Sequence, residues 1–146
     1  VIEASLWRSA VGRAQRSFEV SQELITSLAD DALRRGHNAI IDSVATMEDV
    51  RRDWRDVARR RDGAFVVIVC VCSDEAVHRS RLLHRERRIA GWPELEWSDV
   101  ERTAQRWQPW TDEHLTVDAV HDREDNVRIA AKYARTVLGA SPHDDA

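Results

Sequence analysis

The sequence predicts an α/β fold in which a parallel sheet carries helices on both faces, giving three layers. Two observations predict it. Segments with helical periodicity alternate along the chain with short apolar segments. The strongest strand candidate, residues 64–72, is almost wholly apolar and rich in Val and Ile. Such a segment is typical of a strand buried on both faces in the middle of a parallel sheet.

The first half of the chain is expected to contain two helices with a strand between them. Apolar residues recur at helical spacing over residues 21–36, and a glycine ends the segment. Residues 38–41 follow as a brief apolar strand. Thr46 and Asp49 form a capping-box pattern, which predicts a helix over residues 46–63.

The second half continues the alternation. A helix of residues 73–90 and one of residues 98–107 are expected, each with capping residues at its start. Residues 115–120 are expected as a further strand. The last helix begins at residue 125 or 126 and ends at Gly139.

Composition indicates one globular domain. The chain has 146 residues, 42% hydrophobic and 33% charged, with a net charge of −4. These values argue against a disordered chain and against bulk nucleic-acid binding. No apolar run approaches the roughly 20 residues of a membrane-spanning helix. No basic stretch leads into an apolar one at the N-terminus, and Cys70 and Cys72 are expected as buried thiols, so we expect a cytoplasmic protein.

Asp42 is the first candidate for chemistry. It directly follows the short strand 38–41, and ligands of parallel sheets bind at the carboxyl ends of strands. A carboxylate there can hold Mg²⁺ or accept a hydroxyl proton. The alternative is that Asp42 or Ser43 only caps a turn.

Two groups of arginines accompany it. Arg81, Arg85 and Arg88 share one helical face, where guanidiniums can grip phosphate groups, although a solvated face is the alternative. Arginines between residues 51 and 61 are interleaved with aspartates, which predicts surface ion pairs. Among them Arg51, just after the Asp42 loop, is best placed to reach a ligand.

Tryptophans are dense in one region, at positions 92, 97, 107 and 110. They can line an acceptor pocket or a lid, with Trp92 as a substrate-binding candidate. The alternative is that they pack a small helical region.

Three runs of residues resemble small P-loop kinases. The run Leu33 to Ser43 resembles their helix–Gly–strand–Asp step, and the run Cys72 to Arg85 resembles their fourth strand with an R-L-x-x-R helix leading into the lid. Residues 91–111 resemble a bacterial AAA-type ATP-binding branch, whose relatives include zeta toxin, chloramphenicol phosphotransferase and gluconate kinase. The resemblance covers about residues 1–139, with a lid at about 79–110 and a flexible tail at 140–146.

The resemblance implies a P-loop NTPase-like fold and ATP-dependent phosphoryl transfer to a small-molecule acceptor, with ATP and Mg²⁺ as cofactors. Asp42 matches the acidic residue near Mg²⁺ and the acceptor. Arg81 and Arg85 match the lid arginines that contact phosphates, and Arg88 is a further candidate. The loop after Asp118 matches the adenine-side loop.

One family motif has no counterpart in the printed sequence. The G-x-x-x-x-G-K-[ST] loop supplies backbone N–H groups, a lysine and a hydroxyl to the phosphates. It should precede the first helix, yet no lysine occurs before Lys132. We therefore expect a fragment of a kinase that lacks its first strand and Walker A loop, roughly 30 residues. The alternatives are a degenerate, non-catalytic binding module on the same fold, or another α/β enzyme such as a nucleotide hydrolase.

Overall fold

The computed structural model describes residues 11–86 and 94–139, with side chains described from residue 20 onward. The chain divides into two compact units. One, the helical unit, comprises residues 1–63 and 86–107, and the other, the sheet unit, comprises residues 64–85 and 108–146. Predictions that concern residues 1–10, 87–93 and 140–146 fall outside the described residues.

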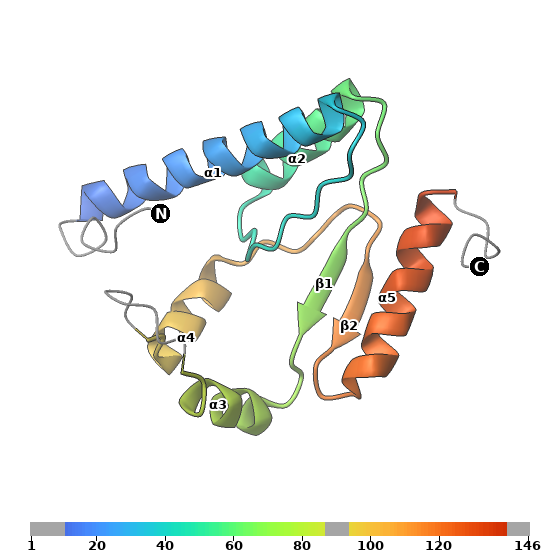
Figure 1. The fold of residues 1–146 in the computed structure, drawn as a ribbon. Helices are drawn as coiled ribbons and strands as arrows, with labels where there is room; N and C mark the ends of the chain where they lie inside the picture. The colour runs from blue at the N-terminus through green and yellow to red at the C-terminus, as the bar shows by residue number, and fades with distance from the viewer. Residues whose placement is uncertain (1–10, 87–93, 140–146) are drawn as a thin grey trace. The chain divides into compact units, whose positions relative to one another are not determined.

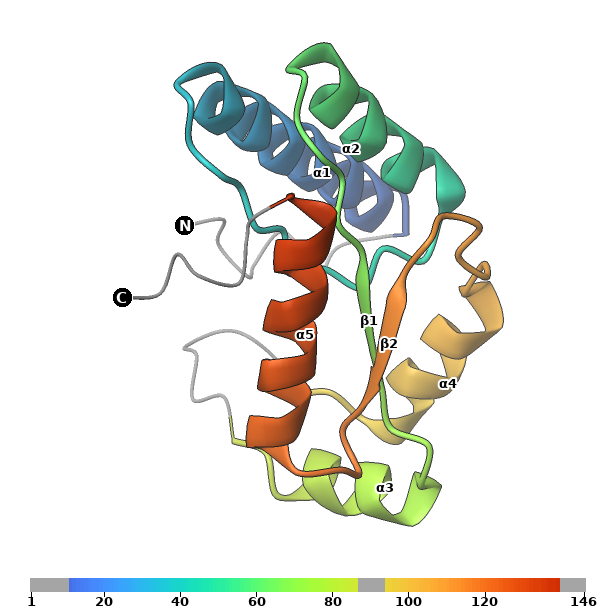
Figure 2. The same ribbon diagram turned by 90° about the vertical axis from the view of Figure 1, so that its right-hand side faces the viewer.

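The helical unit is built on two helices that pack side by side, α1 (Val11–Arg34) and α2 (Glu48–Arg60), as Figures 1 and 2 both show. Apolar residues of the two helices form its core, namely Ala29 from α1 and Trp54, Val57 and Ala58 from α2. A third helix, α4 (Trp97–Arg106), also belongs to this unit.

Polar contacts fix how α1 and α2 pack. The indole Nε1 of Trp54 donates a hydrogen bond to Thr26 Oγ1 at 3.1 Å. Near the C-terminal ends of both helices, Arg61 donates through Nε and Nη2 to the two carboxylate oxygens of Asp30, at 3.0 and 2.7 Å. The pair is bidentate, a geometry that gives direction as well as attraction.

The sheet unit contains a parallel pair of strands, β1 (Ile68–Val71) and β2 (Leu115–Asp118). Ile68 is in register with Leu115, and Val71 with Asp118. Two further helices complete the unit. Helix α3 (Glu75–Leu83) follows β1, and α5 (Arg123–Val137) lies beside β2 (Figures 1 and 2).

Parallel pairing, as predicted, is therefore confirmed, while the strands are shorter than expected. Val67, Val69 and Val117 are buried, but Ile68 and Val71 remain 38% and 39% exposed. The prediction that the 64–72 segment is buried on both faces is wrong for these residues. The full three-layer sheet stays a prediction, because the described residues contain two strands.

The strand predicted over residues 38–41 is wrong. The structure has no regular element between residues 37 and 46, and Ile40 is 96% exposed. A parallel strand is held by hydrogen bonds to a neighbour. Among the described residues the sheet consists of β1 and β2 alone, so this segment pairs with no strand.

Several helix boundaries also differ from the predictions. Helix α1 begins at Val11, so Ser21 lies inside it, and Met47 rather than Thr46 precedes α2 as its N-cap. Helix α4 begins after Glu96, and α5 begins after Asp122, whose side chain accepts its first N–H groups.

Helix ends marked by local chemistry are confirmed. Asp74 caps α3 by accepting the Val77 N–H at 3.0 Å, although α3 ends at Leu83, well before residue 90. Gly36 and Gly139 have φ of 78° and 71°, the left-handed conformation in which glycine ends a helix. The prediction of buried thiols is wrong for Cys70, which is exposed, while Cys72 is partly exposed.

Candidate functional site

Asp42 lies in the irregular segment between α1 and α2, and its side chain is exposed. The segment is shaped by its own residues. Ser43 Oγ accepts the backbone N–H of Ala45 at 3.4 Å, and Ala45 has a φ of 43°. A non-glycine residue in this conformation is uncommon and needs support from its surroundings.

Arg51 supplies that support. It lies in the first turns of α2 with a side chain that is 0% exposed. Its Nε donates a hydrogen bond to the Ala45 carbonyl at 2.7 Å, and its Nη1 lies 3.8 Å from Glu48 Oε2. Its guanidinium carbon also stands 5.1 Å from the ring centre of Trp107, the residue that ends α4. A role of Arg51 at a substrate stays a prediction.

Other arginines of α2 form the predicted ion pairs on the surface. Arg52 pairs with Asp49 at 3.1 Å, and Arg59 pairs with Asp56 at 2.9 Å. Both arginine side chains are more than half exposed, so these pairs contribute little to stability. The contrast sets Arg51 apart from its neighbours.

Arg81 lies near the C-terminal end of α3, in the sheet unit. Its Nη1 donates a hydrogen bond to the backbone carbonyl of Ala119, directly after β2, at 2.8 Å. Arg85 lies two residues beyond the end of α3, and both arginines are exposed. A guanidinium has five N–H donors, so one bond to a carbonyl orients Arg81 and leaves donors for an anion.

A carboxylate that the sequence analysis had not singled out as a site residue lies at the carboxyl end of β2, next to Ala119. Asp118, the last residue of β2, accepts the backbone N–H of Ser73 at 3.1 Å and that of Val120 at 3.0 Å. Its own carbonyl accepts from Asn126 Nδ2 at 2.7 Å. The signal was available, because Asp118 ends an apolar strand just as Asp42 ends an apolar segment.

These hydrogen bonds stabilise the charged form of Asp118. They hold the pKa of its carboxyl below the usual value of 3.8, with the Ser73 side chain as the largest cause, followed by the backbone N–H groups of Val120 and Ser73. The Asp118 carboxylate therefore fixes the loop between β2 and α5, and does so best when ionised.

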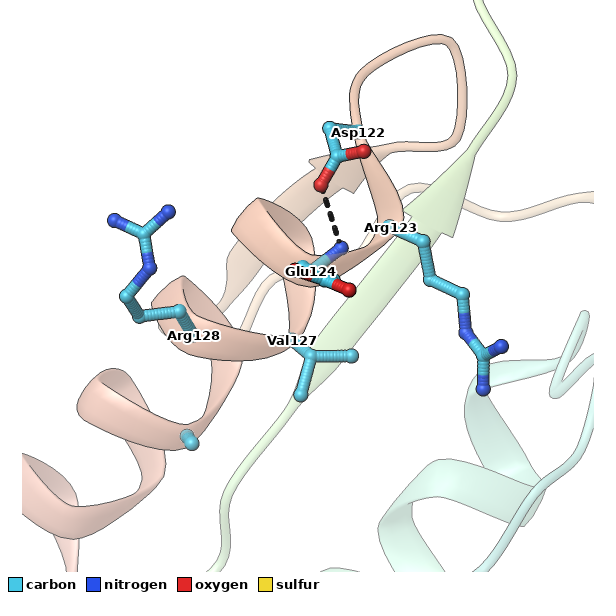
Figure 3. Close-up of a pocket in the computed structure, with 6 residues that line it drawn as sticks. Asp122, Arg123, Glu124, Val127 and Arg128 are labelled. Atoms are coloured by element: carbon cyan, nitrogen blue, oxygen red, sulfur yellow. Dashed lines mark hydrogen bonds between the residues drawn. The ribbon is translucent and has the colours of Figure 1, made fainter.

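An open hollow of about 560 Å³ lies along the first turns of α5 (Figure 3) and is lined by Asp122, Arg123, Glu124, Val127, Arg128 and Ala131. At its rim Asp122 Oδ1 accepts the N–H groups of Glu124 and Asp125, at 2.8 and 3.2 Å. The helix start is thus already capped by a carboxylate, which disfavours a second anion there.

Among residues 11–86 and 94–139, no cluster of three or more His, Cys, Asp or Glu side chains could hold a metal ion by itself. In the same part of the chain, no helix combines the length and the apolar character needed to cross a membrane.

The predicted site residues fall in both units. Asp42 and Arg51 belong to the helical unit, and Arg81 and Arg85 to the sheet unit. That Asp42, Arg81 and Arg85 act together on the same phosphates, as the resemblance implies, therefore stays a prediction. Arg88 and Trp92 lie outside the described residues.

The sequence was also compared with models of known protein families. A family model described as an AAA domain matches residues 4–108, which is most of the chain. The chain belongs to the AAA domain family. No curated protein and no solved structure matches the chain significantly.

This AAA domain family is P-loop kinase-like, and its members generally bind ATP and Mg²⁺. The family membership confirms the resemblance at that level, while the narrower likeness to particular kinases stays a prediction. The match includes the Asp42 segment, Arg51 and α3, and ends before β2.

The residues of this AAA domain fit the two expected cofactors unequally. Mg²⁺ binds through one or two carboxylates together with phosphate oxygens and water, and the exposed Asp42 can provide such a carboxylate. The ATP phosphates need a glycine-rich loop with a lysine, and the printed sequence contains no G-x-x-x-x-G-K-[ST] run.

Proposed function

We propose that this AAA domain is part of an ATP-dependent phosphotransferase that acts on a hydroxyl of a small molecule, and that it is inactive without a phosphate-binding loop. The AAA family match over residues 4–108 carries the proposal, because the family is nucleotide-binding and kinase-like. The acceptor can be a sugar, an antibiotic or a nucleotide; a protein hydroxyl is the alternative outside the small-molecule class.

In the proposed reaction Asp42 is the residue nearest the acceptor. Its carboxylate would orient Mg²⁺ and accept the proton of the attacking hydroxyl, which places the oxygen for attack on the terminal phosphate. The exposure of Asp42 supports this role, because a ligand can reach the carboxylate.

Arg81 and Arg85 would stabilise the charge on the transferred phosphoryl group. Fixed guanidiniums are effective in this role, because they need no reorientation when charge develops. The hydrogen bond from Arg81 to the Ala119 carbonyl supports it, since it restrains the side chain before any ligand binds. Arg88 and Trp92 are the further candidates for substrate contact, whereas the fully buried Arg51 would act on a substrate only through other residues.

Two experiments test the proposal. Sequencing the coding DNA upstream of Val1 tests for an in-frame G-x-x-x-x-G-K-[ST] run. A protein that includes such a run should phosphorylate its acceptor with ATP, and Asp42→Ala should lower turnover at least about tenfold, as expected for loss of a general base. Unchanged turnover would remove Asp42 from the mechanism. Asp112→Ala is a suitable control, because Asp112 lies after α4 in the other unit.

The second candidate is a non-catalytic binding module, favoured by the lack of a phosphate-binding motif in the printed sequence. The Trp-rich segment would then form a protein interface. This candidate predicts that the 146-residue chain is stable and monodisperse and has no affinity for ATP. Tight MgATP binding by the same chain in calorimetry would contradict it.

A further inference from the structure

Arg51 is the only large side chain that is completely buried among the described residues, although it carries a permanent charge. Burying a guanidinium is costly unless the protein supplies partners for it. Arginines nearby on α2, such as Arg52 and Arg59, remain in solvent. The surrounding residues must therefore supply partners for Arg51 that the exposed arginines do not need.

The first partner is the loop that carries Asp42. Ala45, three residues after Asp42, has a φ of 43° and is itself buried. Its carbonyl receives the Arg51 Nε at 2.7 Å, a charge-assisted bond. A strained residue persists only where its surroundings fix it, and this bond holds the peptide group that follows the strained φ.

The second partner is the end of α4. Trp107 is the C-cap of that helix, and its ring faces the Arg51 guanidinium at 5.1 Å. A guanidinium stacks on an indole through its planar face while its edge still donates hydrogen bonds. One side chain can thus hold the Ala45 peptide and the α4 end at the same time.

We infer that Arg51 is a positioning residue, which fixes the Asp42 loop and couples it to the end of α4 through Trp107. The role in catalysis rests on the function proposed for Asp42, while the coupling itself does not. The inference differs from direct substrate contact, because a side chain that is 0% exposed presents no atom to a ligand.

The coupling can be read from a signal on Trp107. The 146-residue chain is labelled with 5-fluorotryptophan, and Trp107→Phe identifies the Trp107 resonance in the fluorine NMR spectrum. Ala45→Gly changes the loop, because glycine relaxes the restriction on φ. Its effect on the Trp107 resonance is measured with Arg51 present and again in Arg51→Lys, which keeps the charge and loses the planar fork.

The expected result is that Ala45→Gly shifts the Trp107 resonance when Arg51 is present, and that the shift disappears in the Arg51→Lys background. An equal shift in both backgrounds, or none in either, would overturn the inference. Arg59→Lys is the matched control, since Arg59 is exposed on the same helix, and it should leave the shift unchanged. If Arg51 only stabilised the fold, the effect of Ala45→Gly on the Trp107 resonance would not depend on Arg51.

A second measurement covers the case in which Arg51→Lys does not fold. Trp107→Leu removes the stacked ring from the other side. It should speed backbone hydrogen exchange in the Asp42–Ala45 loop about tenfold, as expected for loss of a cation–π contact to a desolvated guanidinium. Trp97→Leu, at the start of α4, should not. Equal effects of the two leucine variants would reject the coupling.

A Mg²⁺ titration separates this inference from the proposed function. If Asp42 binds Mg²⁺, the ion should move the Trp107 resonance in the unmodified chain but not in Arg51→Lys. If Mg²⁺ moves nothing while the Ala45→Gly coupling is present, Asp42 does not bind Mg²⁺ by itself and the positioning role of Arg51 stands. If Mg²⁺ binds and moves the resonance equally in both chains, the positioning role fails.

Discussion

The carboxylate of Asp118 accepts the backbone N–H of Ser73 at 3.1 Å and so ties the end of β2 to the end of β1. The two residues are 45 positions apart in sequence. Because the strands are parallel, both ends lie at the same edge of the sheet, where the loops to α3 and α5 begin. The same oxygen of Asp118 also accepts from Val120, so one side chain organises both loops.

Removing this carboxylate should destabilise the sheet unit. Asp118→Ala leaves the N–H groups of Ser73 and Val120 without their acceptor, and should lower the urea midpoint of unfolding. Asp118→Asn keeps an oxygen at the same place, so its urea midpoint should fall between those of Asp118→Ala and the unmodified chain. Glu113→Ala, an exposed carboxylate shortly before β2, serves as the control. A midpoint for Asp118→Ala equal to that of the control would show that the contact contributes nothing.

Acid should weaken the same contact in a defined direction. The hydrogen bonds at Asp118 hold its pKa in the folded protein below 3.8, the value for an unperturbed aspartate. A carboxylate of lowered pKa contributes stability that is complete above pH 3.8 and is lost as the pH falls through its folded pKa. Unfolding midpoints measured from neutral pH down into this range should therefore fall less steeply in Asp118→Asn than in the unmodified chain. Parallel curves would exclude Asp118 from the acid response.

Elements with local signals could be predicted from the sequence. The β2 strand lies inside the predicted segment 115–120, and Asp74, Gly36 and Gly139 mark helix ends as expected. Each signal depends on a single side chain or a short apolar run, which acts within one turn or one strand.

The misplaced elements depend on distant parts of the chain. Residues 38–41 have the composition of a strand, but a strand also needs a neighbour, and sequence periodicity carries no information about one. Ser21 has the chemistry of an N-cap, yet it can act as one only where a helix begins, and α1 begins at Val11.

The candidate site was predictable in its residue types and not in its packing. Asp42 and Arg81 could be singled out from their places after an apolar run and on a helical face. Arg51 was singled out only for its place after the Asp42 loop. Its burial and its contact with Trp107, 56 residues further along the chain, could not be predicted. Such a contact arises from tertiary structure alone.

Gly36 should resist substitution for a backbone reason. Its φ is 78°, a value that strains any residue with a Cβ atom. A Cβ built there would meet no atom within 4 Å, so the cost of an alanine comes from the backbone and not from a clash. Gly36→Ala should lower the free energy of unfolding by about 1 kcal/mol. Gly63→Ala is the matched control, because Gly63 has no positive φ and its Cβ would make an ordinary contact with the Ala58 carbonyl. Equal losses for both glycines in urea unfolding would argue against the left-handed conformation of Gly36.

Val57 tests whether the contact between α1 and α2 is the core of the helical unit. Its side chain is 2% exposed, so Val57→Ala removes buried apolar area and should lower the free energy of unfolding by about 2 kcal/mol. Val20→Ala on α1 is the matched control, because Val20 is 57% exposed. Both substitutions exchange a β-branched residue for alanine inside a helix, so the gain in helix propensity is the same and cancels in the comparison. If the two variants unfold at the same urea concentration, Val57 is not buried in solution and the two helices do not pack as described.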